Sequence, residues 1–211
     1  MKIKWYGHSC FLIETDYKIL TDPFDQSVGY PFNPEQPDII TESHQHYDHN
    51  AHDRVKGAPA VVKRPGEHSF GSLRIRGQST YHDEAKGKKR GGNIIFRFET
   101  SEGISIAHLG DIGHIPDNDT YDFLEALDVL MLPVGGYFTV APDKAAQIVE
   151  TVKPGIVIPM HYKTEYIPDF PIETEKPFLE ALGWETKTYD SLVLNKLKLD
   201  ELYKNCILFN I

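Results

Sequence analysis

Histidines and an aspartate gather in one six-residue stretch of the chain, His44-x-His46-x-Asp48-His49. Four of the ten histidines of the chain lie between positions 44 and 52, a density that a solvated loop does not explain. His44 and His46 stand two positions apart where a short apolar strand ends, so their rings project to the same side of the backbone. Neutral imidazole and carboxylate are common ligands of zinc and similar divalent cations. This stretch therefore predicts metal binding.

Four ligands are too few to complete two metal sites, so further ligands must come from distant parts of the chain. Three residues are suitable because each directly follows a predicted apolar strand: His82, Asp111 and His161. Side chains at such positions can meet along one edge of a sheet sandwich. Taken alone, each of the two histidines is better explained by a structural role, and Asp111 after Gly110 could belong to a turn.

Short strands are the main elements that must position these residues. Apolar segments separated by polar turns predict strands at residues 3–6, 11–14, 18–21, 38–41, 60–62, 72–81, 93–100 and 103–108. The later part of the chain predicts helices at 117–126, 142–153 and 174–182, and strands at 128–132 and 155–159. Residues 191–211 are expected to be strand-like. The pattern predicts an α/β (or α+β) sandwich with helices on its outer faces.

Composition and charge narrow the classes of function. No linker or repeat divides the sequence, so we expect one domain spanning residues 1–211. The net charge of −9 makes nucleic acid an unlikely partner, because binding to phosphates depends on Lys and Arg. No apolar run approaches the roughly 20 residues of a membrane span. The N-terminus has no apolar stretch like that of a signal peptide. We therefore expect a cytoplasmic protein in which Cys10 and Cys206 are free.

The six-residue motif, followed in order by His82, Asp111 and His161, resembles the five-motif signature of the metallo-β-lactamase superfamily. The stretches 7–14, 19–24, 109–113 and 159–162 are similar to the small bacterial branch near ascorbate-6-phosphate lactonase and the phospholipase D that cleaves N-acylphosphatidylethanolamine. The resemblance spans about residues 1–165, and the last 40 or so residues match no family that we can name.

This resemblance implies a four-layer αββα sandwich with two adjacent metal sites at one edge. The first site would be formed by His44, His46 and His82. The second would be formed by Asp48, His49 and His161, and Asp111 would bridge the two. We expect two divalent cations, zinc first, with Mn²⁺, Ni²⁺ or Fe²⁺ as alternatives.

The implied activity is that of a metal-dependent hydrolase. A hydroxide bridging the two metals would cleave an ester-type bond, such as a lactone or phosphodiester, in a small molecule. Asp48 and Asp111 would then act in catalysis as well as in metal binding, with Asp111 orienting the hydroxide. No Gly-x-Ser-x-Gly elbow is present, and this mechanism needs no nucleophile from the protein.

Two histidines are candidates for the proton donor to the leaving group. His114 lies three residues after Asp111, and His8 belongs to one of the stretches typical of the family. A structural role explains either of them at least as well, and His108, within its strand, is expected to have a structural role or to support a metal ligand. The basic run at residues 86–93 could attract a phosphorylated substrate. A solvated loop is the simpler interpretation of that run.

Three alternatives use the same motifs. Di-iron reductases of this fold resemble a His-x-Glu-x-Asp pattern, but here His46 replaces the glutamate, and 211 residues leave no room for a flavin domain. A nuclease of the superfamily is disfavoured by the negative charge and the short chain, although a weak phosphodiesterase activity would fit. In a non-catalytic metal-binding protein the metals would stiffen the fold or sense a ligand, whereas the complete set of seven ligands favours catalysis. A β-lactam is not the expected substrate.

Overall fold

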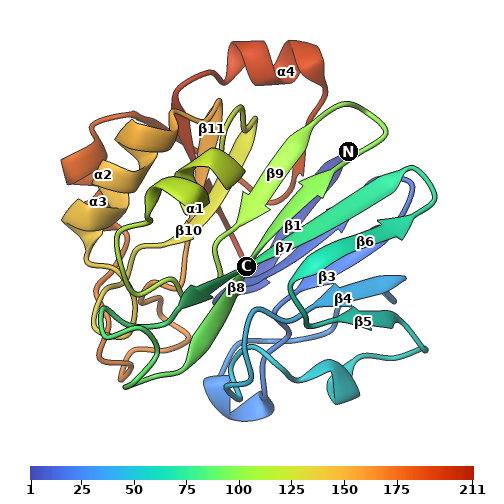
Figure 1. Cartoon of the computed structure of the whole chain (residues 1–211), viewed down its shortest axis with the longest axis horizontal. Helices are drawn as coiled ribbons and strands as arrows, with labels where there is room; N and C mark the ends of the chain where they lie inside the picture. The colour runs from blue at the N-terminus through green and yellow to red at the C-terminus, as the bar shows by residue number, and fades with distance from the viewer.

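Two β-sheets pack face to face at the centre of the computed structural model, which describes residues 1–211 (Figure 1). The first sheet has six strands in the order β13-β1-β2-β3-β4-β5. Their bounds are Lys2–Gly7 (β1), Cys10–Glu14 (β2), Lys18–Thr21 (β3), Ile39–Thr41 (β4), Ala60–Val62 (β5) and Leu192–Val193 (β13). Strands β1 to β3 form an antiparallel meander, and β3, β4 and β5 run parallel.

The second sheet has eight strands in the order β12-β14-β11-β10-β9-β8-β7-β6. Their bounds are Gly66–Phe70 (β6), Leu73–Tyr81 (β7), Gly92–Glu99 (β8), Ser105–His108 (β9), Val129–Pro133 (β10), Ile156–Met160 (β11), Glu185–Tyr189 (β12) and Asn205–Phe209 (β14). Strands β6 to β9 are antiparallel, whereas β9, β10, β11, β14 and β12 are parallel.

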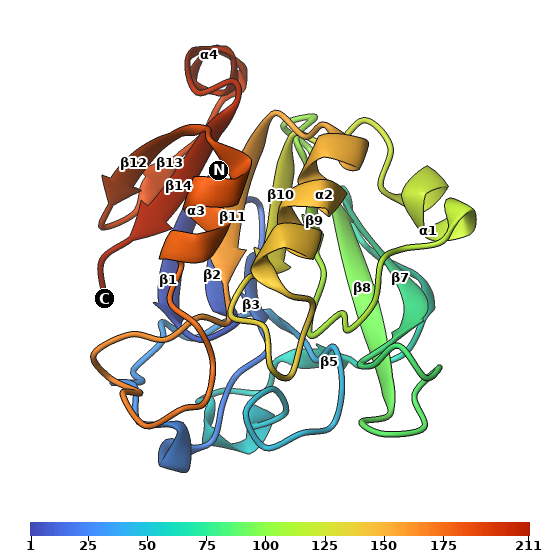
Figure 2. The same cartoon turned by 90° about the vertical axis from the view of Figure 1, so that its left-hand side faces the viewer.

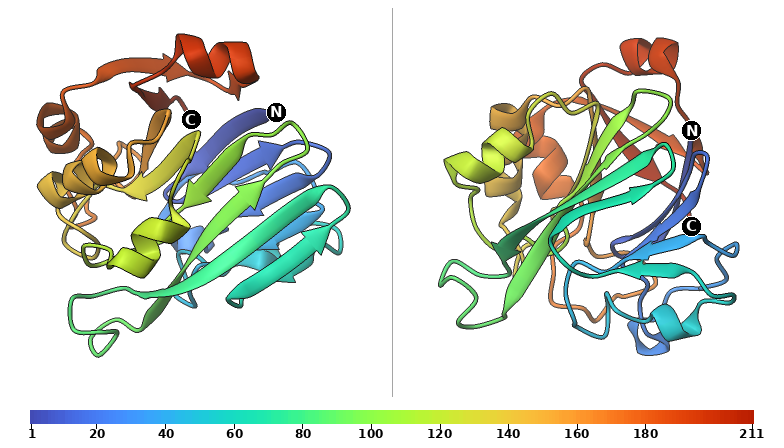
Figure 3. Two further views of the ribbon diagram at one scale, coloured as in Figure 1. Left: turned by 45° about the horizontal axis from the view of Figure 1, so that its top comes forward. Right: turned by 45° about the vertical axis from the view of Figure 1, so that its right-hand side comes forward.

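The main core lies between the two sheets, which Figure 3 shows as successive layers. Residues on a strand alternate between its two faces, so Phe11 and Ile13 of β2 enter this core with Phe96 and Phe98 of β8. Leu12 of β2 points to the opposite face and belongs to a second apolar cluster. The centre of the first sheet is thus buried on both faces, which explains the consecutive apolar residues of β2 and β4.

Helices cover the outer side of the eight-stranded sheet. They are α1 (Asn118–Phe123), α2 (Pro142–Val152) and α3 (Lys176–Leu182), and Figure 2 shows α2 and α3 over β10 and β11. A fourth helix, α4 (Lys196–Glu201), lies at one end of the molecule (Figure 1). These layers confirm the predicted sandwich. On the six-stranded side, the outer layer consists of connecting segments with two 3-10 helices, Gln26–Val28 and His52–Arg54.

The strands and helices expected before residue 183 are present, with shifts of at most two residues at their ends, except that α1 stops at Phe123, three residues before the predicted residue 126. Two strands were not predicted: β6 and β12 are the edge strands of the second sheet, and their polar sequences lack an apolar pattern. The expectation of strand-like structure for residues 191–211 is incomplete because α4 interrupts it. Asn195 caps this helix by accepting a hydrogen bond from the Lys198 N–H.

Two smaller expectations can also be compared with the structure. Cys10 and Cys206 are both buried and unpaired, as predicted. None of the helices combines the length and the apolar character that crossing a membrane requires.

Candidate metal centre

The candidate ligands converge because each follows the end of a strand. His44, His46, Asp48 and His49 lie in the segment after β4, and the other three candidates come after β7, β9 and β11. Four of the histidines lie close to the carboxylate of Asp111, which is buried. Its Oδ2 atom is near four imidazole Nε2 atoms, at 3.0 Å from His82, 3.2 Å from His161, 3.3 Å from His49 and 3.9 Å from His44. The structure therefore brings together residues that are up to 117 positions apart in the sequence (161 − 44).

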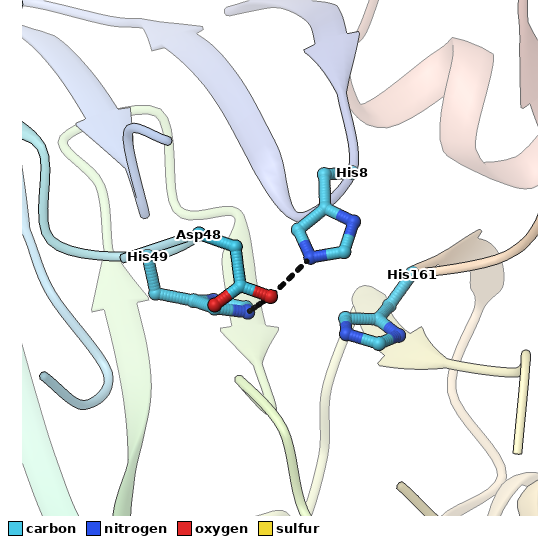
Figure 4. Close-up of side chains that lie close together, drawn as sticks. All are labelled: His8, Asp48, His49 and His161. Atoms are coloured by element: carbon cyan, nitrogen blue, oxygen red, sulfur yellow. Dashed lines mark hydrogen bonds and ion pairs between the residues drawn. The ribbon is translucent and has the colours of Figure 1, made fainter. Parts of the chain in front are cut away.

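Two groups of ligand atoms flank Asp111. In the first group, His44, His46 and His82 offer atoms that all lie within 4.8 Å of one another. The second group contains Asp48, His49 and His161, and it also includes His8 (Figure 4). These are the two groups that the family resemblance implies, with His8 as an additional member, and His44, His49 and Asp111 form a third group that joins them.

Buried polar atoms without a partner test whether this centre suits a metal ion. The Nε2 atoms of His44, His49 and His161 and the Oδ1 atom of Asp111 are buried and accept no hydrogen bond. Unpaired buried polar atoms are costly, and native proteins rarely leave several of them in one place. Lone pairs of imidazole and carboxylate directed into one space are the donor set that a divalent cation requires. The residues fit such an ion.

Without an ion, the electrostatics of the centre favour these forms for His44 and Asp111. For His49 the charges of Asp111 and Asp48 outweigh burial and hold the pKa well above its usual value, so a metal ion would have to displace that proton. Burial and the nearby charge of His49 lower the pKa of His44 to about 2, so its imidazole is neutral and keeps a lone pair. Burial alone would raise the pKa of Asp111, but His161 and His49 hold it well below the usual range of a carboxyl group. A neutral imidazole beside a charged carboxylate is the protonation state that metal binding needs.

Asp22, which the sequence analysis did not single out, fixes two of the imidazoles. Its Oδ2 atom accepts hydrogen bonds from His49 Nδ1 at 2.8 Å and from the Ser43 hydroxyl at 2.6 Å. The Ser43 oxygen accepts in turn from His44 Nδ1 at 2.9 Å. With Nδ1 donating in both rings, the lone pair of each Nε2 is directed at Asp111. The feature of the sequence that could have indicated Asp22 is the Asp22-Pro23 pair directly after β3.

We expect Asp22→Asn to weaken metal binding about 10- to 100-fold, the usual effect of losing such a supporting contact. The asparagine amide cannot accept from both His49 and Ser43 with the strength of a charged carboxylate. Competition with a chromogenic chelator measures the affinity. Asp128→Asn is a matched control, because Asp128 accepts from the backbone and hydroxyl of Ser105 in the way that Asp22 accepts from Ser43. Equal affinities in the two variants would contradict this role of Asp22.

The absence of a side chain at Gly110 allows the backbone to place Asp111 in the centre. Its φ is +53°, and a Cβ atom there would lie 2.3 Å from Asn93 Oδ1 and 2.5 Å from Ser43 Cβ. Asn93 is held in place because its Oδ1 accepts from the Asp111 N–H at 2.9 Å and its amide donates to Leu109 O. A side chain at position 110 would therefore push apart two segments of the site.

Gly110→Ala should lower the free energy of unfolding by about 3 kcal/mol, from a left-handed backbone combined with overpacking. Gly183→Ala separates the two causes, because Gly183 has φ +67° but no atom within 4 Å of its Cβ position. The control should lose about 1 kcal/mol. Urea unfolding of both metal-stripped variants gives the comparison, and equal losses would show that no clash occurs at Gly110.

The remaining predicted histidines differ in their distance from the centre. His8 is buried, with Nε2 3.2 Å from Asp48 Oδ2 (Figure 4), and its backbone O accepts from the His161 N–H at 3.1 Å. Burial and the charge of His161 lower the pKa of His8 to about 4. His114 uses both ring nitrogens on the backbone, at Tyr81 N and Ile115 O, and does not line the cavity over the centre. His108 contacts the backbone of Ser9 and Gly110, which is the supporting role expected for it.

A cavity of about 270 Å³ opens over Asp111. Besides five of the candidate ligands, its wall contains four side chains: Tyr47, Arg90, Phe138 and Phe170.

Arg90 belongs to the basic run, which is more ordered than the expected solvated loop. The carboxylate of Asp83 accepts the backbone N–H groups of Ala85, Gly87, Lys89 and Arg90.

Comparison with known proteins identifies the family. The model of the beta-lactamase superfamily domain matches residues 2–161, which is well over half of the 211 residues. The chain belongs to the metallo-β-lactamase superfamily. A metal-dependent hydrolase of Desulforamulus reducens from this superfamily's UPF0173 group is 31% identical over 223 aligned residues, covering 89% of this chain and 94% of that protein. Its counterpart from Pyrococcus horikoshii is 32% identical, covering 78% of this chain and 85% of that protein.

A solved structure shows the same superfamily fold over nearly the whole chain. It is a protein of Thermotoga maritima assigned to the metallo-β-lactamase superfamily as a Zn-dependent hydrolase. The two structures agree with a TM-score of 0.80 at 35% identity, covering 99% of this chain and 98% of that one. Together these matches confirm the predicted superfamily, the sandwich fold and the class of metal-dependent hydrolase.

Proposed function

We propose that this metallo-β-lactamase-fold enzyme uses two metal ions to hydrolyse an ester-type bond, such as a lactone or phosphodiester, in a small molecule. One observation carries the proposal: Asp111 Oδ2 lies within 3.9 Å of the Nε2 atoms of four histidines. A single tetrahedral ion cannot use so many ligands, whereas two ions sharing a carboxylate can.

Each ion would have its own set of residues. His44, His46 and His82 would hold the first, Asp48, His49 and His161 the second, and Asp111 would bridge them. Nitrogen and oxygen ligands in these proportions suit zinc, and they also accept manganese, nickel or iron. When bound, such a pair of cations lowers the pKa of water towards neutrality and polarises the group under attack.

The protein's own residues would orient the reactants. Asp111 faces the cavity at the point where both groups of ligands meet, so its carboxylate can direct the attacking water. Asp48 also lines the cavity, and His8 contacts its Oδ2 atom from the buried side. His8 would therefore act through Asp48, since it does not line the cavity itself. We assign no part in the reaction to His114, because the backbone occupies both of its nitrogens.

The test is to strip the protein with a chelator, restore one metal at a time, and screen lactones, phosphodiesters, thioesters and β-lactams. We expect turnover of an ester-type substrate that returns with the second equivalent of metal. Bound metal without turnover on any class would support the non-catalytic alternative. Cleavage of oligonucleotides alone would support the nuclease.

A further inference from the structure

A second cavity adjoins the first at the metal centre. Its volume is about 520 Å³, and it shares His46 and Arg90 with the 270 Å³ cavity over Asp111. We call the larger one the polar compartment and the smaller one the aromatic compartment. A molecule whose reactive bond lies at Asp111 can therefore extend in two directions.

The walls of the two compartments differ in character. In the aromatic compartment, Phe138 and Phe170 pack together with ring centroids 5.9 Å apart, and Tyr47 stands beside them with about half of its surface exposed. Such surfaces bind apolar or aromatic groups. The polar compartment has only two hydrophobic residues among the 15 that line it. A ligand spanning both compartments would be amphipathic.

Arg90 stands at the junction and is held from two sides. Its Nη1 donates to Phe138 O at 3.2 Å, and its guanidinium lies 5.1 Å from the centre of the Phe138 ring. Its backbone N–H donates a hydrogen bond to Asp83 Oδ2 at 2.8 Å. A guanidinium has five N–H donors, so most of them remain available to a ligand. The guanidinium is therefore already held at the junction of the two compartments, where it can bind an anionic group of the substrate.

Charge in the polar compartment points to an anion. Arg90 and Lys63 both line it, and neither forms an ion pair with an acidic residue, although the chain carries a net charge of −9. The acidic residue in the wall, Glu42, is buried and directs its carboxylate to His52 at 2.5 Å and to Gln45 at 3.2 Å. Cations without an acidic partner beside a reaction centre attract and orient anions.

We propose that the substrate is an amphipathic anion, with a phosphate or carboxylate bound by Arg90 and Lys63 and an apolar group packed on Phe138 and Phe170. The cleaved bond lies between these two parts, above Asp111. The position of the cleaved bond rests on the proposed hydrolytic function, whereas the anion site itself does not depend on it.

The test measures binding by calorimetry on the metal-loaded protein. Phenylphosphonate combines an aromatic ring with a phosphate-like group and has no ester bond to cleave. Benzoate is the carboxylate counterpart, and inorganic phosphate lacks the apolar part. The test variant is Lys63→Gln/Arg90→Gln. The matched control is Lys86→Gln/Lys88→Gln, which loses the same charge from exposed positions that line neither compartment.

We expect phenylphosphonate or benzoate to bind at least tenfold more weakly to the test variant, and the control to stay within twofold of the wild type. The stronger of the two ligands identifies the anionic group as phosphate or carboxylate. Inorganic phosphate should bind more weakly than phenylphosphonate. Equal affinities in the wild type and the test variant, or no binding of either aromatic anion at millimolar concentration, would overturn the proposal.

Metal analysis of the same samples separates this proposal from the proposed function. If metal and ester hydrolysis are present but the substitutions leave anion affinity unchanged, the anion site is wrong and the hydrolase stands. If the protein holds no metal but anion binding still depends on Arg90 and Lys63, the hydrolase is wrong and the anion site stands. Circular dichroism and the melting temperature establish that both variants are folded.

Discussion

Asp111→Asn should leave the protein with at most one metal ion and reduce turnover by at least about 10³-fold, more than the loss of a single transition-state hydrogen bond. The amide carries no charge to offset two divalent cations, and its NH₂ group would face imidazole nitrogens that need a cation. Because Asp111 lies between both groups of candidate ligands, its replacement disturbs both sites together. No other single substitution in the chain should have so large an effect.

Mass spectrometry of the metal content and the rate on the best ester-type substrate are the two measurements for this variant. Asp128→Asn serves as the control, because it removes a hydrogen-bonded carboxylate that lines neither cavity at the centre. The control should keep the metal content and rate of the wild type. An Asp111→Asn protein with two metals and undiminished turnover would contradict the role of Asp111 as a bridging ligand.

His161→Ala should empty only the second site, so that the protein keeps one metal and loses most of its turnover, about 10²-fold or more. Both ring nitrogens of His161 are buried without a hydrogen-bond partner, and Nε2 lies 3.2 Å from Asp111 Oδ2. The ring therefore makes no protein hydrogen bond that would explain its burial. His44 and His82 remain in place to hold the first ion.

His114→Ala is the matched comparison, since it removes a histidine whose ring bonds only to the backbone. That variant should keep both metals and at least half of the wild-type rate. Titration of each stripped variant with zinc gives the number of tight sites. If His161→Ala retains two tight sites while His114→Ala loses one, the assignment of the second site is wrong.

The part of the centre that could be predicted from sequence is the part encoded locally. The spacing from His44 to His49 is a strong signal on its own, and His82, Asp111 and His161 each follow an apolar strand that the pattern reveals. Strand ends meet at one edge of a sandwich, so convergence followed from the fold class. The structure adds the distances, which no pattern of residue types contains.

The supporting residues could not be predicted because their roles depend on contacts across the chain. In the sequence Asp22 is indistinguishable from an ordinary turn aspartate. Its contacts with Ser43 and His49 depend on the pairing of β3 with β4. His8 meets Asp48 only when the turn after β1 lies beside the segments that follow β4 and β11, where the His8 backbone O accepts from the His161 N–H. In the sequence Arg90 is one of several cations in a basic run. Its place in the cavity wall depends on the hydrogen bonds of its backbone N–H to Asp83 and of its guanidinium to Phe138 O.

The central claim is tested most directly by anomalous diffraction from crystals of the zinc-loaded protein. We expect two peaks about 3.5–4 Å apart, one on each side of Asp111, as in other two-metal sites. The first peak should contact His44, His46 and His82, and the second should contact Asp48, His49 and His161. A single fully occupied peak in an active protein, or peaks remote from Asp111, would contradict it.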